Sequence, residues 1–236
     1  MKKTFRMLLS FLMVIILSMP AFAAVPGKDA ESKDYKEYLQ LVSDGVLGEE
    51  VSFEYWQDFK ARSAQLESAL ENSKDFYVVY DSASTRSAGY SMRAGDVFVT
   101  NATSFFGFTG HSGIAISSTQ ILHIAGKGHH PATISLNSWN SSYTSKGWTK
   151  VYRHKSSSVA MAAAKWAKNT YAGSNATYAI NFNTESTHET YCSKIVWQAY
   201  RYGPTTSSVA NNGTHAILSP YDLHFTIRGL SKVADL

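Results

Sequence analysis

The stretch that decides the fold is Thr190-Tyr191-Cys192-Ser193-Lys194-Ile195-Val196-Trp197-Gln198-Ala199-Tyr200-Arg201-Tyr202-Gly203, which holds the only cysteine of the chain. Its apolar residues fall at positions 192, 195, 196, 199 and 200, the spacing of one face of an α-helix. Gly203 followed by Pro204 predicts the end of this helix, and Glu189 or Thr190 is expected to cap its start. Cys192 is therefore expected in the first turn, with its side chain directed into the protein.

A helix start is a favourable place for a reactive thiol. Its partial positive charge and unpaired N–H groups stabilise a thiolate, and the same N–H groups can hold an oxyanion. Free cysteine is also commonly buried as a small apolar side chain, so Cys192 taken alone favours a structural role. The remainder of the chain has to decide between the two.

The N-terminus has the pattern of a secretory signal peptide at residues 1–23. Lys2, Lys3 and Arg6 precede a short apolar run from Met7 to Met19, and small residues follow it. The run is shorter than the roughly 20 residues of a membrane span, so no span is expected after cleavage. The rest of the chain holds 19 basic and 18 acidic residues, which gives no support to nucleic-acid binding. The predicted location is secreted, extracellular or associated with the cell wall.

Residues 24–92 are expected to form an N-terminal helical extension, and residues 93–236 the main domain. The extension has a short helix at 35–43, a helix at 53–73 capped by Ser52, and a strand or connector at 76–80. In the main domain we expect strands at 96–100, 111–117, 120–126 and 147–153, a Gly/Phe-rich loop at 104–110, polar residues at 127–145, a helix at 159–171 capped by Ser157 or Ser158, irregular chain at 176–183 and a turn at 219–223.

Two histidines lie on strands that are joined by the short connection around residues 117–119. A two-residue loop would place His111 and His123 on opposite faces of the hairpin. A three-residue loop would pair Ile116 with Gln120, and the histidines would then be diagonal neighbours about 7–8 Å apart between backbones. The pair can work together only with the longer or a bulged loop.

A thiol nucleophile needs a base, and the base needs a group that orients it. His111, expected to open its strand after the glycine-rich loop, is the candidate base, and His123 is the candidate orienting group. A metal site from these histidines with His129, His130 and Asp96 is the rival interpretation, but the usual zinc spacings are absent. A serine triad is disfavoured because the chain has no Gly-x-Ser-x-Gly. No metal or other cofactor is expected.

Three blocks carry a family resemblance. Gly110-His111-Ser112-Gly113-Ile114-Ala115-Ile116, Ile121-Leu122-His123-Ile124-Ala125 and Tyr191-Cys192-Ser193-Lys194-Ile195-Val196-Trp197-Gln198-Ala199-Tyr200 resemble the permuted papain-like amidases of the YiiX/YycO type, distant relatives of NlpC-type cell-wall peptidases. In NlpC proteins the cysteine helix precedes the histidine strands, whereas here it follows them. The resemblance covers residues 93 to 225. Many permuted members carry Glu at the third catalytic place, where this chain has His123.

The resemblance implies an α+β, circularly permuted papain-like fold, with a small antiparallel sheet packed against the cysteine-bearing helix. It also implies a secreted cysteine hydrolase that cleaves amide bonds, with Cys192 as nucleophile, His111 as base and His123 as the third polar residue. The Cys192 N–H would hold the oxyanion, with Tyr178 or Tyr191 as a possible helper. Peptidoglycan, or another amide of the cell envelope, is the implied substrate.

Two other functions stay open from the sequence. An acyl- or lipid-directed hydrolase or transferase on the same fold is one. A non-catalytic envelope-binding module is the other, suggested by Trp139, Tyr143 and Trp148. If Cys192 and His111 form a thiolate–imidazolium pair, the pKa of the thiol is expected well below its free value of about 8.5.

Overall fold

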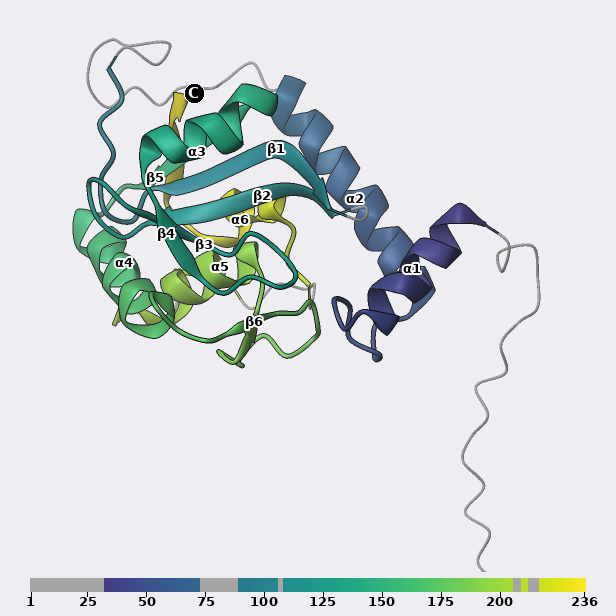
Figure 1. The fold of residues 1–236 in the computed structure, drawn as a ribbon. Helices are drawn as coiled ribbons and strands as arrows, with labels where there is room; N and C mark the ends of the chain where they lie inside the picture. Colours follow the sequence, from purple (N-terminus) through teal and green to yellow (C-terminus); the bar gives the residue numbers. More distant parts are fainter. Residues whose placement is uncertain (1–31, 73–88, 106–107, 206–208, 212–216) are drawn as a thin grey trace, which may run out of the picture.

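A computed structural model describes residues 32–72, 89–105, 108–205, 209–211 and 217–236. The expected signal peptide and the strand or connector at 76–80 lie outside these residues. The described part is a mixed α+β structure in which helices lie on both faces of an antiparallel sheet (Figure 1).

The main sheet has the strand order β4-β3-β2-β1-β5-β8, and its neighbouring strands are antiparallel. Its strands are β1 Val97–Phe105, β2 Phe108–Ala115, β3 Ile121–His123, β4 Ala132–Ile134, β5 Thr149–His154 and β8 Leu230–Asp235. A separate parallel pair joins β6 Thr177–Tyr178 to β7 Glu189–Thr190. Strand β8 was not expected from the sequence, because its polar residues give it only a weak pattern.

The helices are α1 Lys33–Ser43, α2 Phe53–Asn72, α3 Leu136–Ser142, α4 Ser157–Tyr171, α5 Cys192–Tyr202 and α6 Leu223–Thr226, with 3-10 turns at η1 Thr144–Lys146 and η2 Pro220–Asp222. Helices α1, α2, α4 and α5 agree closely with the sequence prediction, whereas α3 and α6 were not predicted. The Ser52 hydroxyl caps α2 by accepting the Tyr55 amide at 3.2 Å, as predicted. Helix α4 begins earlier than expected, because Ser156 supplies its cap.

The two faces of the sheet carry different cores. Alternate residues of a strand point to opposite faces. Val97, Ile114 and Leu122 pack with residues of α4 and α5 on one face. Phe98 and Ala115 pack on the other face, under α3. Helix α5 is therefore held against the sheet by the apolar stripe that its sequence predicted.

The expected loop at 104–110 is instead the tip of a hairpin. Strand β1 continues to Phe105 and β2 starts at Phe108, with a register shift between Thr100 and Ser104. His111 is consequently the fourth residue of β2 and does not open the strand, which corrects the sequence prediction. The preceding Gly110 has a φ of 86°, and a Cβ there would lie 2.7 Å from the Tyr221 ring.

The N-terminal helices pack on the segments that flank α5 in the sequence. Leu41 and Trp56 share one apolar cluster with Ile180, Tyr191 and Ile217. The Gly48 amide also donates to the Ile180 carbonyl at 2.8 Å. Helices α1 and α2 therefore support the chain on either side of Cys192.

Candidate active site

Helix α5 places Cys192 in its first turn, as the sequence indicated. The N-cap residue is Tyr191, and its side chain caps none of the helix amides. The predicted capping by Glu189 or Thr190 is wrong, because these two residues form β7. With no side chain capping this turn, its amides are suited to stabilising a thiolate or an oxyanion.

The thiol lies beside Ser112, the residue that follows His111 on β2. Successive backbone amides of a strand point alternately to the neighbouring strand on either side. On the β3 side of β2, the Ile116 amide donates to the Gln120 carbonyl at 2.9 Å. The Ser112 amide points to the same side as the Ile116 amide. Because β3 ends at His123, the Ser112 amide lies beyond the end of that strand. This amide favours the charged form of Cys192 and so acts to lower the pKa of its thiol. The Ser112 hydroxyl makes no hydrogen bond of normal geometry, but it too lies near enough to favour the thiolate.

Burial has the largest influence on the thiol. Cys192 is only 5% exposed, and burial raises the pKa of its thiol although Ser112 and Ser193 act in the opposite direction. The expected lowering of the thiol pKa is therefore wrong for the free protein. Removal from water destabilises the thiolate by more than Ser112 and Ser193 stabilise it. The resting thiol is protonated at neutral pH.

The two candidate histidines meet on the opposite face of β2. The register pairs Ile114 with Leu122, which gives the longer loop at 117–119 that the pair requires. His111 Nε2 lies 2.9 Å from His123 Nδ1, and the rings meet edge to face at 5.2 Å between centroids. The predicted juxtaposition of these side chains is confirmed.

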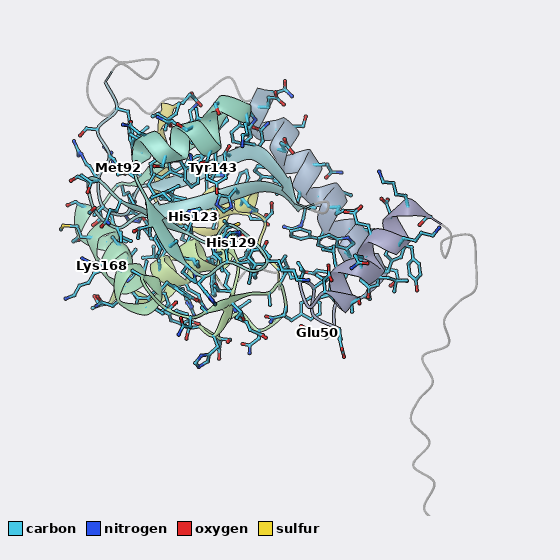
Figure 2. The ribbon with its side chains drawn as sticks, viewed as in Figure 1. Glu50, Met92, His123, His129, Tyr143 and Lys168 are labelled. Atoms are coloured by element: carbon cyan, nitrogen blue, oxygen red, sulfur yellow. The ribbon has the colours of Figure 1, made fainter. Side chains whose placement is uncertain are left out.

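Both histidines are neutral at neutral pH. Burial lowers the pKa of His111 well below its usual value, and proximity to His123 adds to the effect. Burial, followed by the nearby His129, lowers the pKa of His123 to about 4 (Figure 2). Each neutral ring carries one proton, and the tautomer decides which ring donates in the His111–His123 contact.

Two aromatic residues of α3 enclose the histidine pair. Trp139 stacks on the His111 ring at 5.6 Å between centroids, and Tyr143 lies 4.7 Å from it. The Tyr143 hydroxyl is 3.3 Å from His123 Nδ1. The sequence prediction missed this contact because residues 127–145 were interpreted as polar connection. The usable signal was the spacing of four residues between the two aromatic side chains, which puts them on one helix face.

A buried amine and an amide hold the segment that leads to Cys192. Lys194 Nζ donates to the carbonyls of Asn183 and Glu189 at 2.6 and 2.7 Å. One turn later, Gln198 Nε2 donates to the carbonyls of Thr184 and Ser186 at 2.6 and 3.1 Å. Burial lowers the pKa of Lys194 to about 8. Neither residue was singled out from the sequence, in which they look like polar positions of an amphipathic helix.

Tyr178 and Tyr191, the tyrosines named as possible oxyanion helpers, are both close enough to Cys192 to sense its charge. Burial raises the pKa of each phenol, and the thiolate raises it further. The Tyr191 hydroxyl accepts the Leu218 amide at 3.3 Å, so it is already engaged in the fold. Tyr178 remains the better candidate of the two.

The residues of the rival metal site are used elsewhere. Asp96 accepts hydrogen bonds from Arg153 at 2.7 Å and from the Tyr90 hydroxyl at 2.6 Å. His130 Nδ1 lies 3.0 Å from the Ala176 carbonyl. Within the described ranges, no group of three or more His, Cys, Asp or Glu side chains could hold a metal ion. In the same ranges no helix has the length and apolar character needed to cross a membrane.

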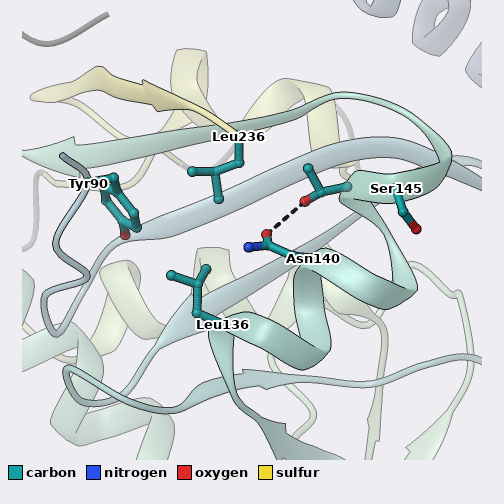
Figure 3. A pocket seen from close by; sticks show the side chains of 6 residues that line it. Tyr90, Leu136, Asn140, Ser145 and Leu236 are labelled. Atoms are coloured by element: carbon teal, nitrogen blue, oxygen red, sulfur yellow. Dashed lines mark hydrogen bonds between the residues drawn. The ribbon is translucent and has the colours of Figure 1, made fainter. Parts of the chain in front are cut away.

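A pocket lies beside α3 and Leu236 (Figure 3). It is lined by Tyr90, Leu136, Asn140, Thr144, Ser145 and Leu236. Thr144 Oγ1 donates to Asn140 Oδ1 at 3.0 Å across this face. Because its lining holds neither a histidine nor a thiol, we do not assign the reaction to this pocket.

Comparison with known proteins identifies the family. Residues 65–230 match the family described as lipoprotein N-acylation protein LnsA-like, and the chain belongs to that family. It is 30% identical over 258 residues to an uncharacterized 30.3 kDa protein of Bacillus thuringiensis, covering 92% of this chain and 93% of that protein. A match among solved structures is the metalloprotein YiiX of Escherichia coli O157:H7, with 16% identity, a TM-score of 0.46, and coverage of 62% of this chain and 99% of the other.

Proposed function

We propose that the protein is a cysteine-dependent acyl-handling enzyme of the cell envelope, which forms a thioester on Cys192 and passes the acyl group to an amine. Support comes from the family, whose description concerns N-acylation of lipoproteins, and from the thiol at the helix start. The observation that carries the proposal is the pairing of His111 with His123 at 2.9 Å on β2, the strand whose next residue, Ser112, favours the thiolate of the buried Cys192.

The first half of the reaction is attack by Cys192 on an ester carbonyl carbon. As the sulfur–carbon bond forms, the thiol proton moves to His111 Nδ1 and the carbonyl oxygen becomes an oxyanion. Amides at the start of α5 would hold this oxyanion. The carbon–oxygen bond of the ester then breaks, and the leaving alcohol takes the proton from His111. The product is an acyl thioester on Cys192.

The second half transfers the acyl group. An amine attacks the thioester carbonyl and gives a proton to His111, and the sulfur–carbon bond breaks. Cys192 leaves as a thiolate and recovers the proton from His111. Water in place of the amine would make the same site a hydrolase, so the environment of the acceptor decides between transfer and hydrolysis.

The circularly permuted papain-like architecture is part of this proposal. The histidine strands β2 and β3 precede the cysteine helix α5 in the chain, and α5 packs on the face of the sheet that holds Ile114 and Leu122. Cleavage of amides in cell-wall peptides is the second candidate, because the same thiol and base serve amide hydrolysis. It rests on the resemblance of the three sequence blocks to the permuted amidases.

The test is to incubate the purified protein with phospholipid vesicles and a lipopeptide that has a free amine. Mass spectrometry should show an N-acylated lipopeptide, a lysophospholipid in equal amount, and an acyl adduct on Cys192 that hydroxylamine removes. Cys192→Ala should give none of the three. Release of new amino groups from purified peptidoglycan, without lipid turnover, would instead support the amidase and contradict acyl transfer.

A further inference from the structure

Two hydrogen-bonding groups in the histidine face of the site reach the same nitrogen atom. His123 Nδ1 lies 2.9 Å from His111 Nε2 and 3.3 Å from the Tyr143 hydroxyl. Tyr143 and both histidines are buried, at 8% exposure or less. We propose that the Tyr143 hydroxyl competes with His111 for His123 Nδ1, and that a bound acyl substrate relieves this competition by accepting the Tyr143 hydrogen bond.

The competition follows from what a neutral imidazole can do. A ring nitrogen either offers one lone pair or carries one proton, so it cannot serve two strong partners at once. In the productive arrangement His111 Nε2–H donates to His123 Nδ1, which leaves His111 Nδ1 free to take the thiol proton. If Tyr143 donates instead, His111 loses its acceptor, and its proton is no longer held on Nε2.

The alternative with the proton on His123 Nδ1 is also unproductive. His123 then donates to His111 Nε2 or to the Tyr143 oxygen. Once His111 Nε2 accepts a hydrogen bond, the proton of this neutral ring must sit on Nδ1. His111 in that tautomer cannot act as a base toward Cys192. The resting site therefore divides between one productive arrangement and arrangements in which Tyr143 or the wrong tautomer blocks the base.

A substrate can supply the hydrogen-bond acceptor that the Tyr143 hydroxyl lacks in the productive arrangement. Within the part of the chain that the structure describes, the Tyr143 hydroxyl has one hydrogen-bond partner, His123. A buried hydroxyl that loses its acceptor is destabilised. A carbonyl or ester oxygen of an acyl group bound at Cys192 would supply that acceptor. The Tyr143 phenol is within electrostatic range of Cys192, since a thiolate there raises the pKa of the phenol.

Tyr143 thus becomes a positioning residue that couples substrate binding to the tautomer of the base. The inference deepens the proposed function, since it concerns the same thiol and the same acyl substrate. It differs from a structural role in its consequence. Removing the hydroxyl should make the free thiol more reactive and catalysis slower.

The experiment compares Tyr143→Phe with the wild type in the full chain. Without substrate, the rate of iodoacetamide labelling of Cys192 at pH 7.5 should rise about 2- to 10-fold, because His111 no longer has a competitor. Turnover of p-nitrophenyl octanoate should fall by about 10-fold in kcat, because the hydrogen bond to the substrate is lost. An unchanged or slower labelling rate would overturn the competition, and an unchanged kcat would overturn the role of the substrate.

The matched control is Tyr90→Phe, which removes a partly buried hydroxyl bonded to Asp96 at 2.6 Å while Arg153 keeps that carboxylate paired. Neither the rate of iodoacetamide labelling nor kcat should change in Tyr90→Phe. As a measurement on the intact wild type, the ¹⁵N shifts of the histidine rings should show mixed tautomers that become uniform with an octanoyl methyl ketone. Uniform tautomers in the free protein would contradict the inference. All these readings are independent of whether the natural substrate is a lipid or a cell-wall peptide.

Discussion

The two faces of strand β2 give the candidate site residues different surroundings. Toward α5, Ser112 and Ile114 belong to an apolar surrounding in which the thiol sits neutral and buried. Toward α3, His111 lies among aromatic rings and a second histidine, with hydrogen bonds available. One strand thereby separates the buried thiol from the paired histidines. The proposed reaction requires these two environments to meet beyond the end of β3.

The strongest way to break this comparison is to remove the base. His111→Ala should lower turnover of p-nitrophenyl octanoate by about 10²–10⁴-fold, the usual contribution of general acid–base catalysis. Because nucleophile and base act as a unit, the double variant with Cys192→Ala should be no slower than Cys192→Ala alone. Additive losses in steady-state kinetics would mean that the two sides of β2 do not cooperate.

The next prediction concerns the segment that Lys194 and Gln198 hold. Lys194→Met keeps the aliphatic stem but removes two part-buried hydrogen bonds to carbonyls, so the free energy of unfolding should fall by about 1–3 kcal/mol. Turnover should fall about 10-fold, because the chain that enters α5 at Cys192 is held less firmly. Urea unfolding and steady-state kinetics measure the two effects. Lys165→Met, at an exposed position of α4, is the control and should change stability by less than about 0.5 kcal/mol.

The histidine side should make the fold sensitive to acid. The pKa of His123 is lowered from its usual value of 6.5 to about 4 in the folded protein, so the unfolded chain binds the proton more readily. The stability that depends on neutral His123 is present above pH 6.5 and is lost as the pH falls toward 4, amounting to at most about 3 kcal/mol.

Urea unfolding at pH 7.5 and 4.5 tests this prediction in wild type and in His123→Asn. The variant should lose less stability between the two pH values, because the residue that must be protonated is gone. His224, whose pKa is also lowered to about 4 by burial, remains in both proteins. An equal loss in the two would assign the acid sensitivity to other groups.

The smallest expected effect is on the pH dependence of Cys192 alkylation. Since burial raises the pKa of the Cys192 thiol, its alkylation by iodoacetamide should rise with pH only above the free value of about 8.5. Ser112→Ala removes a group that favours the thiolate, so the rise should move further upward. Ser145→Ala, at an exposed position near α3, should leave the profile unchanged. A plateau of reactivity below neutral pH would restore the ion pair that the sequence suggested and contradict the neutral resting state.

Local patterns in the sequence were sufficient for much of this fold. The spacing of apolar residues after Cys192 predicted α5, and Ser52 marked the start of α2 correctly. The hairpin argument identified the loop length that brings His111 to His123. These predictions worked because each depends on residues close together in the chain. The same local reasoning placed His111 at a strand end, since the pairing of β1 with β2 across residues 104–109 has no clear pattern.

What the sequence by itself determined is the chemistry on offer: one thiol at a helix start and two histidines on one hairpin face. Only the tertiary structure decided how these groups behave. Burial of Cys192 at the start of α5 raises the pKa of its thiol. Tyr143, which directly follows α3, reaches His123 from a segment in which the sequence showed no recognised pattern. The physical reason is that desolvation and hydrogen-bond competition depend on which distant segments exclude water from a group. Helix periodicity and strand alternation describe neighbours within one element, so they cannot specify that environment.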